Sequence, residues 1–155
     1  MSLPRNSIST DLPTMPKFSS LPETRFQVAA RAKHCCEYCM SMDTFSPNYF
    51  TIDHIIPEPL GGTDALDNLA YACFLCNRLK SNKFTVLDIV SDSWISLFNP
   101  RMQDWNEHFA WSEDLTSIIG LSAIGRVTVD ELQLNRAKLI AYRKAVIPFG
   151  VHPPG

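Results

Sequence analysis

The chain has 155 residues, a formal net charge of −2 and a sequence pI near 6.0, with 45% hydrophobic and 19% charged residues. This length suits one domain with a hydrophobic core, and the composition is ordinary for a globular protein. No apolar run approaches the ~18 residues that span a bilayer, and the N-terminus lacks the layout of a signal peptide. We therefore expect a soluble, cytoplasmic protein.

The charge is distributed unevenly. Residues 84–125 contain six acids and one base, Arg101, whereas residues 126–155 contain five bases and two acids. A slightly acidic chain argues weakly against binding to nucleic acid, but a mean charge conceals local patches of either sign. The composition therefore leaves nucleic-acid binding open.

The N-terminal region divides into a tail and a helix. Residues 1–18 contain three prolines among scattered Ser and Thr without periodicity, which predicts a flexible tail. Ser20-Leu21-Pro22-Glu23 has the form of a capping box. It predicts a short helix over residues 21–33.

The central region predicts a hairpin followed by a helix. Residues 49–56 are rich in β-branched and aromatic types, which favours a strand. The Pro- and Gly-rich residues 57–67 predict a loop. A return strand over residues 69–72 and a short helix over residues 77–83 complete this region.

The second half of the chain predicts a mixture of short strands and helices. The expected elements are a strand near residues 94–98, a helical turn at 101–107, strands at 108–111 and 116–121, a helix over 123–134 capped by Ser122, and a helix over 136–147. We expect three parts in all: the tail, a core at 19–84, and an extension at 85–155 that packs on the core.

Four of the five cysteines form two Cys-x-x-Cys pairs, Cys36/Cys39 and Cys73/Cys76. Two residues between thiolates let one turn present both sulfurs to a tetrahedral ion, and two such turns close a four-sulfur site. The pattern predicts a structural zinc site, with four unrelated thiols or two disulfides as the alternatives. Cys35 has the wrong spacing, so we expect it to be a separate buried thiol.

A second group of polar residues favours metal-assisted hydrolysis of a phosphodiester. Asp53 offers a carboxylate for a hard cation, and the neighbouring His54 offers an imidazole that can deprotonate water. Asn77, at the start of the expected helix, adds a neutral oxygen ligand. A cation such as Mg²⁺ is usually held by few protein groups together with water and phosphate.

The order of these residues resembles the HNH endonuclease family, in the variant whose last letter is Asn. The chain reads Asp53-His54-Ile55-Ile56-Pro57, Gly61-Gly62, Asn68-Leu69 and Cys73-x-x-Cys76-Asn77-x-x-Lys80. The resemblance implies an α+β fold with a ββα-metal (His-Me finger) core and zinc-binding Cys-x-x-Cys pairs, flanked by the N-terminal helix and a C-terminal α/β extension. It also implies an endonuclease that nicks or cuts DNA, in preference to RNA.

The resemblance assigns a role to each residue of the pattern. His54 is expected to be the general base, Asp53 and Asn77 the ligands of a catalytic Mg²⁺ or Mn²⁺, and Asn68 a brace for the loop and His54. The alternative is a DNA-binding module, stapled by zinc, that has no catalytic activity.

Two further expectations concern binding surfaces. Arg78, Lys80 and Lys83 follow the second cysteine pair without an intervening acid, so we expect them to contact phosphates that flank the cut. The C-terminal half is expected to enlarge the core. Its second expected role is either to set substrate choice or to form a homodimer interface.

Overall fold

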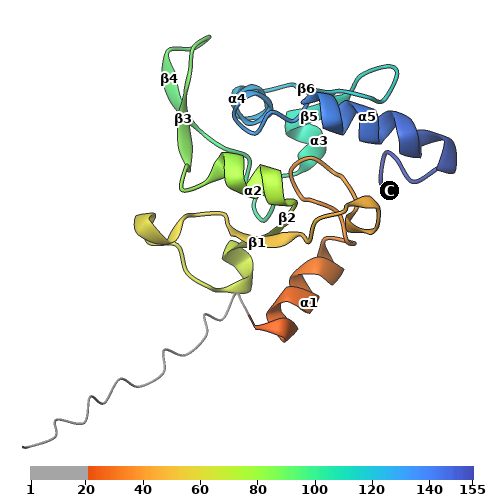
Figure 1. The fold of residues 1–155 in the computed structure, drawn as a ribbon. Helices are drawn as coiled ribbons and strands as arrows, with labels where there is room; N and C mark the ends of the chain where they lie inside the picture. The colour runs from red at the N-terminus through yellow and green to blue at the C-terminus, as the bar shows by residue number, and fades with distance from the viewer. Residues whose placement is uncertain (1–20) are drawn as a thin grey trace, which may run out of the picture.

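The computed structural model describes residues 21–155, and the expected tail at residues 1–18 lies outside the described residues. Short helices and three two-stranded antiparallel sheets make up this part of the chain (Figure 1). The helices are α1 (Pro22–Arg31), α2 (Phe74–Lys80), α3 (Trp105–His108), α4 (Ala123–Glu131) and α5 (Ala137–Val146). The strands are β1 (Thr51–His54), β2 (Leu69–Ala72), β3 (Thr85–Asp88), β4 (Ser93–Ser96), β5 (Phe109–Trp111) and β6 (Ile118–Gly120). This mixture agrees with the expected α+β class.

The hairpin of β1 and β2, followed directly by α2, is the part of the fold that positions the site. Asp53 lies opposite Ala70 and His54 opposite Leu69 in the register of the hairpin. All four residues of β2 are buried, because α1 packs against this strand, and α2 contacts β1 (Figure 1). The sequence prediction of a hairpin followed by a helix is therefore confirmed.

One hydrophobic core joins the two halves of the described chain. Its buried cluster includes Val28 and Leu69 from the first half and Phe98, Phe109 and Leu134 from the second. Within residues 21–155, no helix combines the length and the apolar character needed to cross a bilayer.

Arg143 of α5 connects the extension to the first cysteine pair. Its side chain is fully buried and donates hydrogen bonds to the carbonyl oxygens of Thr116 (2.9 Å), Leu134 (2.7 Å) and Cys39 (3.4 Å). Its guanidinium also lies 5.2 Å from the centroid of the Trp111 ring. A buried charge is tolerated because so many acceptors surround it.

The structure differs from the sequence prediction in the β3–β4 hairpin. One strand was expected near residues 94–98, but two strands pair with Leu87 opposite Trp94. The side chains of Ile89, Val90 and Trp94 are exposed, by 87%, 73% and 71%. The turn of the hairpin extends away from the body of the protein (Figure 1), so the apolar residues near it are exposed, whereas Val86 and Ile95 pack against the core. The exposed apolar residues blurred the alternating pattern on which the prediction rested.

Helix boundaries also differ. Helix α2 begins at Phe74 rather than Asn77, because the Cys73 sulfur accepts a hydrogen bond from the Cys76 N–H and acts as the N-cap. Cysteine is not a usual capping residue, so the signal was missed. The cap of α4 by Ser122 is confirmed, but the helix ends at Glu131, since Gln133 has a positive φ of 47°. The N-cap of α1 is Leu21, without a side-chain cap, and Ser20 lies outside the described residues.

Candidate active site and cysteine cluster

Asp53 is held on the buried side of β1. Its side chain is 3% exposed, with Oδ2 accepting a 2.6 Å hydrogen bond from the Tyr38 hydroxyl and Oδ1 lying 3.2 Å from Lys80 Nζ. Burial raises the pKa of the Asp53 carboxyl, and Lys80 and Tyr38 oppose that rise. Through Tyr38, which lies between Cys36 and Cys39, and through Lys80, Asp53 therefore connects the first cysteine pair to the end of α2.

Lys80 is buried, contrary to the expected contact with phosphate. Only 1% of the residue is exposed, and Nζ also donates a 2.8 Å hydrogen bond to the carbonyl oxygen of His54. Burial lowers the pKa of the Lys80 ammonium group, and Asp53 opposes the change. The expectation for Lys80 is corrected, because its ammonium group is used inside the fold and does not reach the surface.

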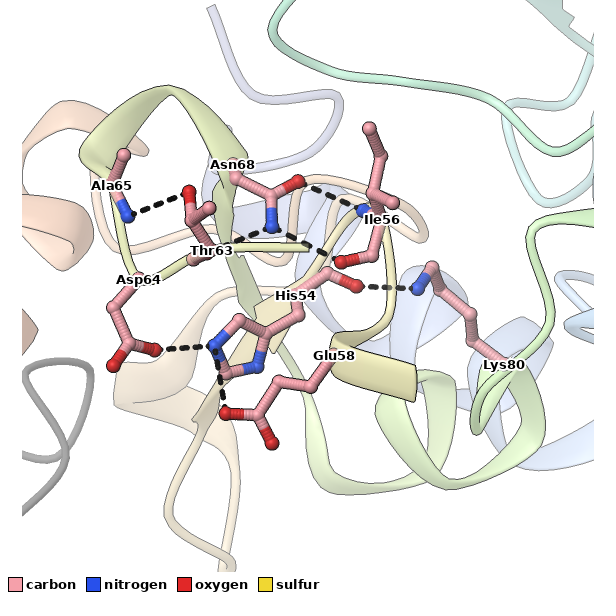
Figure 2. A network of polar contacts seen from close by, with 8 residues as sticks. All are labelled: His54, Ile56, Glu58, Thr63, Asp64, Ala65, Asn68 and Lys80. Carbon is pink, nitrogen blue, oxygen red and sulfur yellow. Dashed lines mark hydrogen bonds and ion pairs between the residues drawn. The ribbon is translucent and has the colours of Figure 1, made fainter. Parts of the chain in front are cut away.

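His54 lies on the other side of β1 from Asp53, as alternation along a strand requires. Its Nε2 lies 2.6 Å from Asp64 Oδ1 and 3.9 Å from Glu58 Oε1 (Figure 2). These three side chains form a group whose geometry could hold a metal ion. Sequence reasoning missed both carboxylates, although each lies within ten residues of His54 in a loop that begins where β1 ends.

The loop after β1 folds back toward its own start. Gly61 has φ of +91°, a left-handed conformation that glycine adopts without strain. A Cβ on Gly62 would lie 1.6 Å from the carbonyl oxygen of Ile56, so this approach requires a glycine. The two glycines therefore allow residues 62–64 to pack against the end of β1.

Asn68 joins the two ends of this loop. Its Oδ1 accepts a 2.9 Å hydrogen bond from the Ile56 N–H, and its Nδ2 donates to the carbonyl oxygens of Ile56 (3.1 Å) and Thr63 (2.9 Å) (Figure 2). The side chain is 8% exposed. A buried amide with its hydrogen bonds satisfied holds the backbone rigidly.

Asp53, His54 and Asn77 line one open pocket of about 210 Å³, together with Glu58 and, past the end of α2, Ser81 and Asn82. The structure thus brings together the expected base and the two expected cation ligands. Asn77 is partly exposed, in the second turn of α2.

The remaining bases lie in different surroundings. Arg78 and Lys83 are exposed, and Lys83 forms an ion pair with Glu131. Arg25 and Arg31 of α1 donate hydrogen bonds to backbone carbonyl oxygens, Arg25 to Phe50 (2.8 Å) and Arg31 to Leu66 and Leu69 (2.8 and 2.6 Å). The two arginines of α1 therefore fasten this helix to the hairpin.

The four paired cysteines form a compact buried cluster. The sulfur atoms of Cys36, Cys39, Cys73 and Cys76 all lie within 4.8 Å of one another, and Cys39 Sγ is 3.8 Å from Cys73 Sγ. A disulfide requires about 2.05 Å, so the alternative of two disulfides is wrong. Cys35 is a separate buried thiol, as expected.

Arg136, immediately before α5, closes one side of the cluster. Its Nη1 lies 3.6 Å from Cys76 Sγ and its Nη2 lies 3.5 Å from Cys73 Sγ. A guanidinium at this position compensates the negative charge of thiolates. The cluster, enclosed in this way, could hold a metal ion whose only ligands are sulfur.

Comparison with known proteins agrees with this geometry. Residues 36–83 match the family described as HNH endonuclease. No curated protein and no solved structure matches the chain. The segment from the first cysteine pair to just past α2 therefore matches an HNH endonuclease domain, which suggests nuclease activity in general and a nucleic-acid substrate.

Proposed function

We propose that the protein is a metal-dependent endonuclease that hydrolyses DNA phosphodiester bonds, with His54 as the general base. The observation that carries this proposal is the pocket shared by Asp53, His54 and Asn77. The order of β1, β2 and α2, with α2 against β1, supports a ββα-metal core. The family match of residues 36–83 supports the reaction class.

The residues of the pocket fit a hard divalent cation. Each carboxylate oxygen of Asp53 has one partner, and a carboxylate offers about four lone-pair sites, so the group can still serve as a ligand. Asn77 adds a neutral oxygen, and Mg²⁺ or Mn²⁺ takes its other ligands from water and phosphate. Such a cation supplies positive charge where negative charge develops on the phosphate oxygens.

The resemblance to HNH endonucleases implies the following chemistry for this chain's own residues. His54 accepts a proton from water, and the resulting hydroxide attacks phosphorus. The P–O3′ bond breaks, the 3′ oxygen takes a proton from solvent, and the products are a 5′-phosphate and a 3′-hydroxyl. General-base catalysis of this kind typically contributes about 10²–10⁴-fold to the rate.

The cysteine cluster is proposed to bind structural zinc. Tetrahedral zinc with Zn–S bonds of about 2.3 Å separates its sulfurs by about 3.8 Å, which equals the 3.8 Å between Cys39 and Cys73. The site has four sulfurs and no open position, so its contribution is to the folding free energy.

DNA contacts are proposed for Arg78 and for Lys83, which are exposed near the pocket end of α2. Neutralised phosphates make binding salt-dependent. Arg78→Ala should therefore weaken retardation of DNA on a gel and reduce its dependence on salt. Lys83→Ala should do so less, because Glu131 already neutralises part of its charge.

One observation favours the alternative of a DNA-binding module without catalysis. Asp53 is buried and already paired with Tyr38 and Lys80, which is also what a purely structural carboxylate would do. The alternative predicts salt-dependent DNA binding without cleavage.

Plasmid cleavage separates the two functions. Wild-type protein and His54→Ala are incubated with supercoiled DNA and Mg²⁺, Mn²⁺ or EDTA. We expect cation-dependent nicking or linearisation that is lost in EDTA and falls by about 10²-fold or more in His54→Ala. Circular dichroism and bound zinc should be unchanged in the variant. DNA that is retarded on a gel but never cut with any cation would favour the binding module.

A further inference from the structure

The closest contact of the His54 side chain is with the carboxylate of Asp64, to which the proposed mechanism gives no role. Asp64 Oδ1 lies 2.6 Å from Nε2, and the two side chains are 18% and 29% exposed. Glu58, the other carboxylate nearby, is 3.9 Å from the same nitrogen. A short contact between partly buried groups is a charge-assisted hydrogen bond, and it is much stronger than the longer one.

We propose that Asp64 is the positioning residue of the general base. Its carboxylate accepts the Nε2 hydrogen of His54, which leaves Nδ1 unprotonated and available to the attacking water. The inference rests on the proposed function of His54. It also gives a purpose to the Gly61-Gly62 turn and to Asn68.

The loop delivers Asp64 to His54 through the contacts of its neighbours. Gly62 lies against the Ile56 carbonyl, at a distance that no side chain would allow. Asn68 bonds both to Ile56, two residues after His54, and to the carbonyl oxygen of Thr63, the residue before Asp64. The amide therefore ties the backbone beside the base to the backbone beside the carboxylate (Figure 2).

The hydrogen bond has two chemical consequences. It selects one tautomer, because Nε2 must carry hydrogen to donate to Asp64, so Nδ1 retains its lone pair. Within residues 21–155 no hydrogen bond occupies Nδ1, which lies on the side of the ring away from Asp64 (Figure 2). When Nδ1 takes the proton of water, the adjacent carboxylate stabilises the imidazolium and itself remains ionised.

The same side chains could instead bind a cation, and the two arrangements differ in a measurable way. A cation shared by His54, Glu58 and Asp64 needs an unprotonated Nε2 and would leave hydrogen on Nδ1. Octahedral coordination with bonds of about 2.1 Å would separate its ligand atoms by about 3.0 Å. The 2.6 Å contact is shorter, and Glu58 is farther away, which favours the hydrogen bond.

The kinetic test compares two neighbouring carboxylates. Asp64→Asn removes the acceptor charge, and Asp67→Asn removes the same charge from an exposed residue of the same loop. Saturating kcat and KM are measured on duplex DNA with Mg²⁺. We expect kcat to fall roughly 10- to 100-fold in Asp64→Asn, within the contribution of a general base, with little change in KM. Asp67→Asn should stay within about two-fold of wild type.

A variant cycle and a spectrum complete the test. Asp64→Asn in the His54→Ala background should cause no further loss, since the carboxylate acts only through the imidazole. Nitrogen-15 NMR of the histidine rings in wild-type protein should show His54 with hydrogen on Nε2, and the Asp64→Asn protein should lose that preference. The wild-type spectrum tests the inference even if a variant folds poorly.

The outcomes separate this inference from the proposed function. If His54→Ala cuts DNA as wild type does, the base assignment fails and the positioning role fails with it. If His54→Ala is inactive but Asp64→Asn matches Asp67→Asn, only the positioning role is overturned. Hydrogen on Nδ1 in the wild-type spectrum, or loss of a bound cation in Asp64→Asn, would likewise overturn it in favour of a metal ligand.

Discussion

The cysteine cluster and the His54 pocket lie in the same segment, which matches the HNH endonuclease family, and both could bind a metal ion, but their surroundings are opposite. The four sulfurs belong to residues that are at most 8% exposed, and Arg136 covers one side. The pocket is open, about 210 Å³ in volume, and lined mostly by polar side chains, with Ile52 and Pro57 as its apolar part. A closed sulfur site suits a metal that holds the fold, and an open oxygen site suits one that must meet water and substrate.

The two regions meet at Tyr38. This residue lies between Cys36 and Cys39, and its hydroxyl donates to Asp53 at the wall of the pocket. The segment that carries the first cysteine pair therefore helps to position Asp53 of the pocket through one hydrogen bond. The residues that could bind a metal ion in the cluster and in the pocket are nevertheless different. Variants that affect one region and not the other test this division.

The largest effect is expected from Cys73→Ser. Structural zinc contributes roughly 10–16 kcal/mol of apparent binding free energy in small zinc domains, which is comparable to the total stability of a domain, about 5–15 kcal/mol. The variant should lose bound zinc and its cooperative thermal transition, as measured by mass spectrometry and circular dichroism. His54→Ala is the matched pocket variant and should keep both. A folded, zinc-free Cys73→Ser protein would refute the structural role of the cluster.

Lys80→Ala should have the next largest effect. It leaves the Asp53 carboxylate buried without its charged partner, which typically costs about 3–5 kcal/mol. Urea unfolding measures this loss. Lys83→Ala is the control, because its pair with Glu131 lies at the surface, partly exposed, and contributes about 1 kcal/mol or less. Equal effects of the two variants would show that Lys80 is not holding a buried charge.

A smaller effect is expected from Tyr38→Phe. It removes one hydrogen bond to a charged group, worth about 1.5–3 kcal/mol, while the neighbouring cysteines remain in place. Stability should fall by that amount with zinc content unchanged. Tyr49→Phe, at a side chain that is 95% exposed, should change neither quantity. Loss of zinc in Tyr38→Phe would mean that the two regions are not separable.

The smallest effect is expected from Cys35→Ser. Its thiol is buried, lies 3.6 Å from the Lys33 carbonyl oxygen and is not part of the four-sulfur cluster. The free energy of unfolding should change by about 1 kcal/mol or less, and bound zinc should remain at one ion per chain. A drop in zinc content would show that Cys35 is also a zinc ligand.

Local patterns in the sequence predicted the parts of the fold that are determined by residues close together in the chain. The β1–β2 hairpin, the Ser122 cap of α4 and the grouping of the four cysteines were all predicted, because each depends on spacing along the chain. The β3–β4 hairpin was missed in part because the apolar residues at and beside its turn, Ile89, Val90 and Trp94, are exposed, so burial and pattern disagree there.

Side-chain partners that come from distant or folded-back segments were not predicted. Lys80 was expected at the surface, yet the packing of α2 against β1 directs its ammonium group to Asp53, 27 residues earlier. Asp64 was not among the expected site residues, because its contact with His54 exists only once Gly61, Gly62 and Asn68 have closed the loop.

The sequence by itself determined which chemical groups this protein has and their order: two cysteine pairs, an Asp-His pair, a glycine turn and two asparagines in HNH order. Tertiary structure decided which partner each of these groups has and how far each is buried. Asp53 is buried and paired with Tyr38 and Lys80 at the wall of the pocket, and His54, which is less buried, lines the same pocket and is paired with Asp64. Residue types and spacing are local properties, but burial and charge pairing depend on which segments the fold packs together.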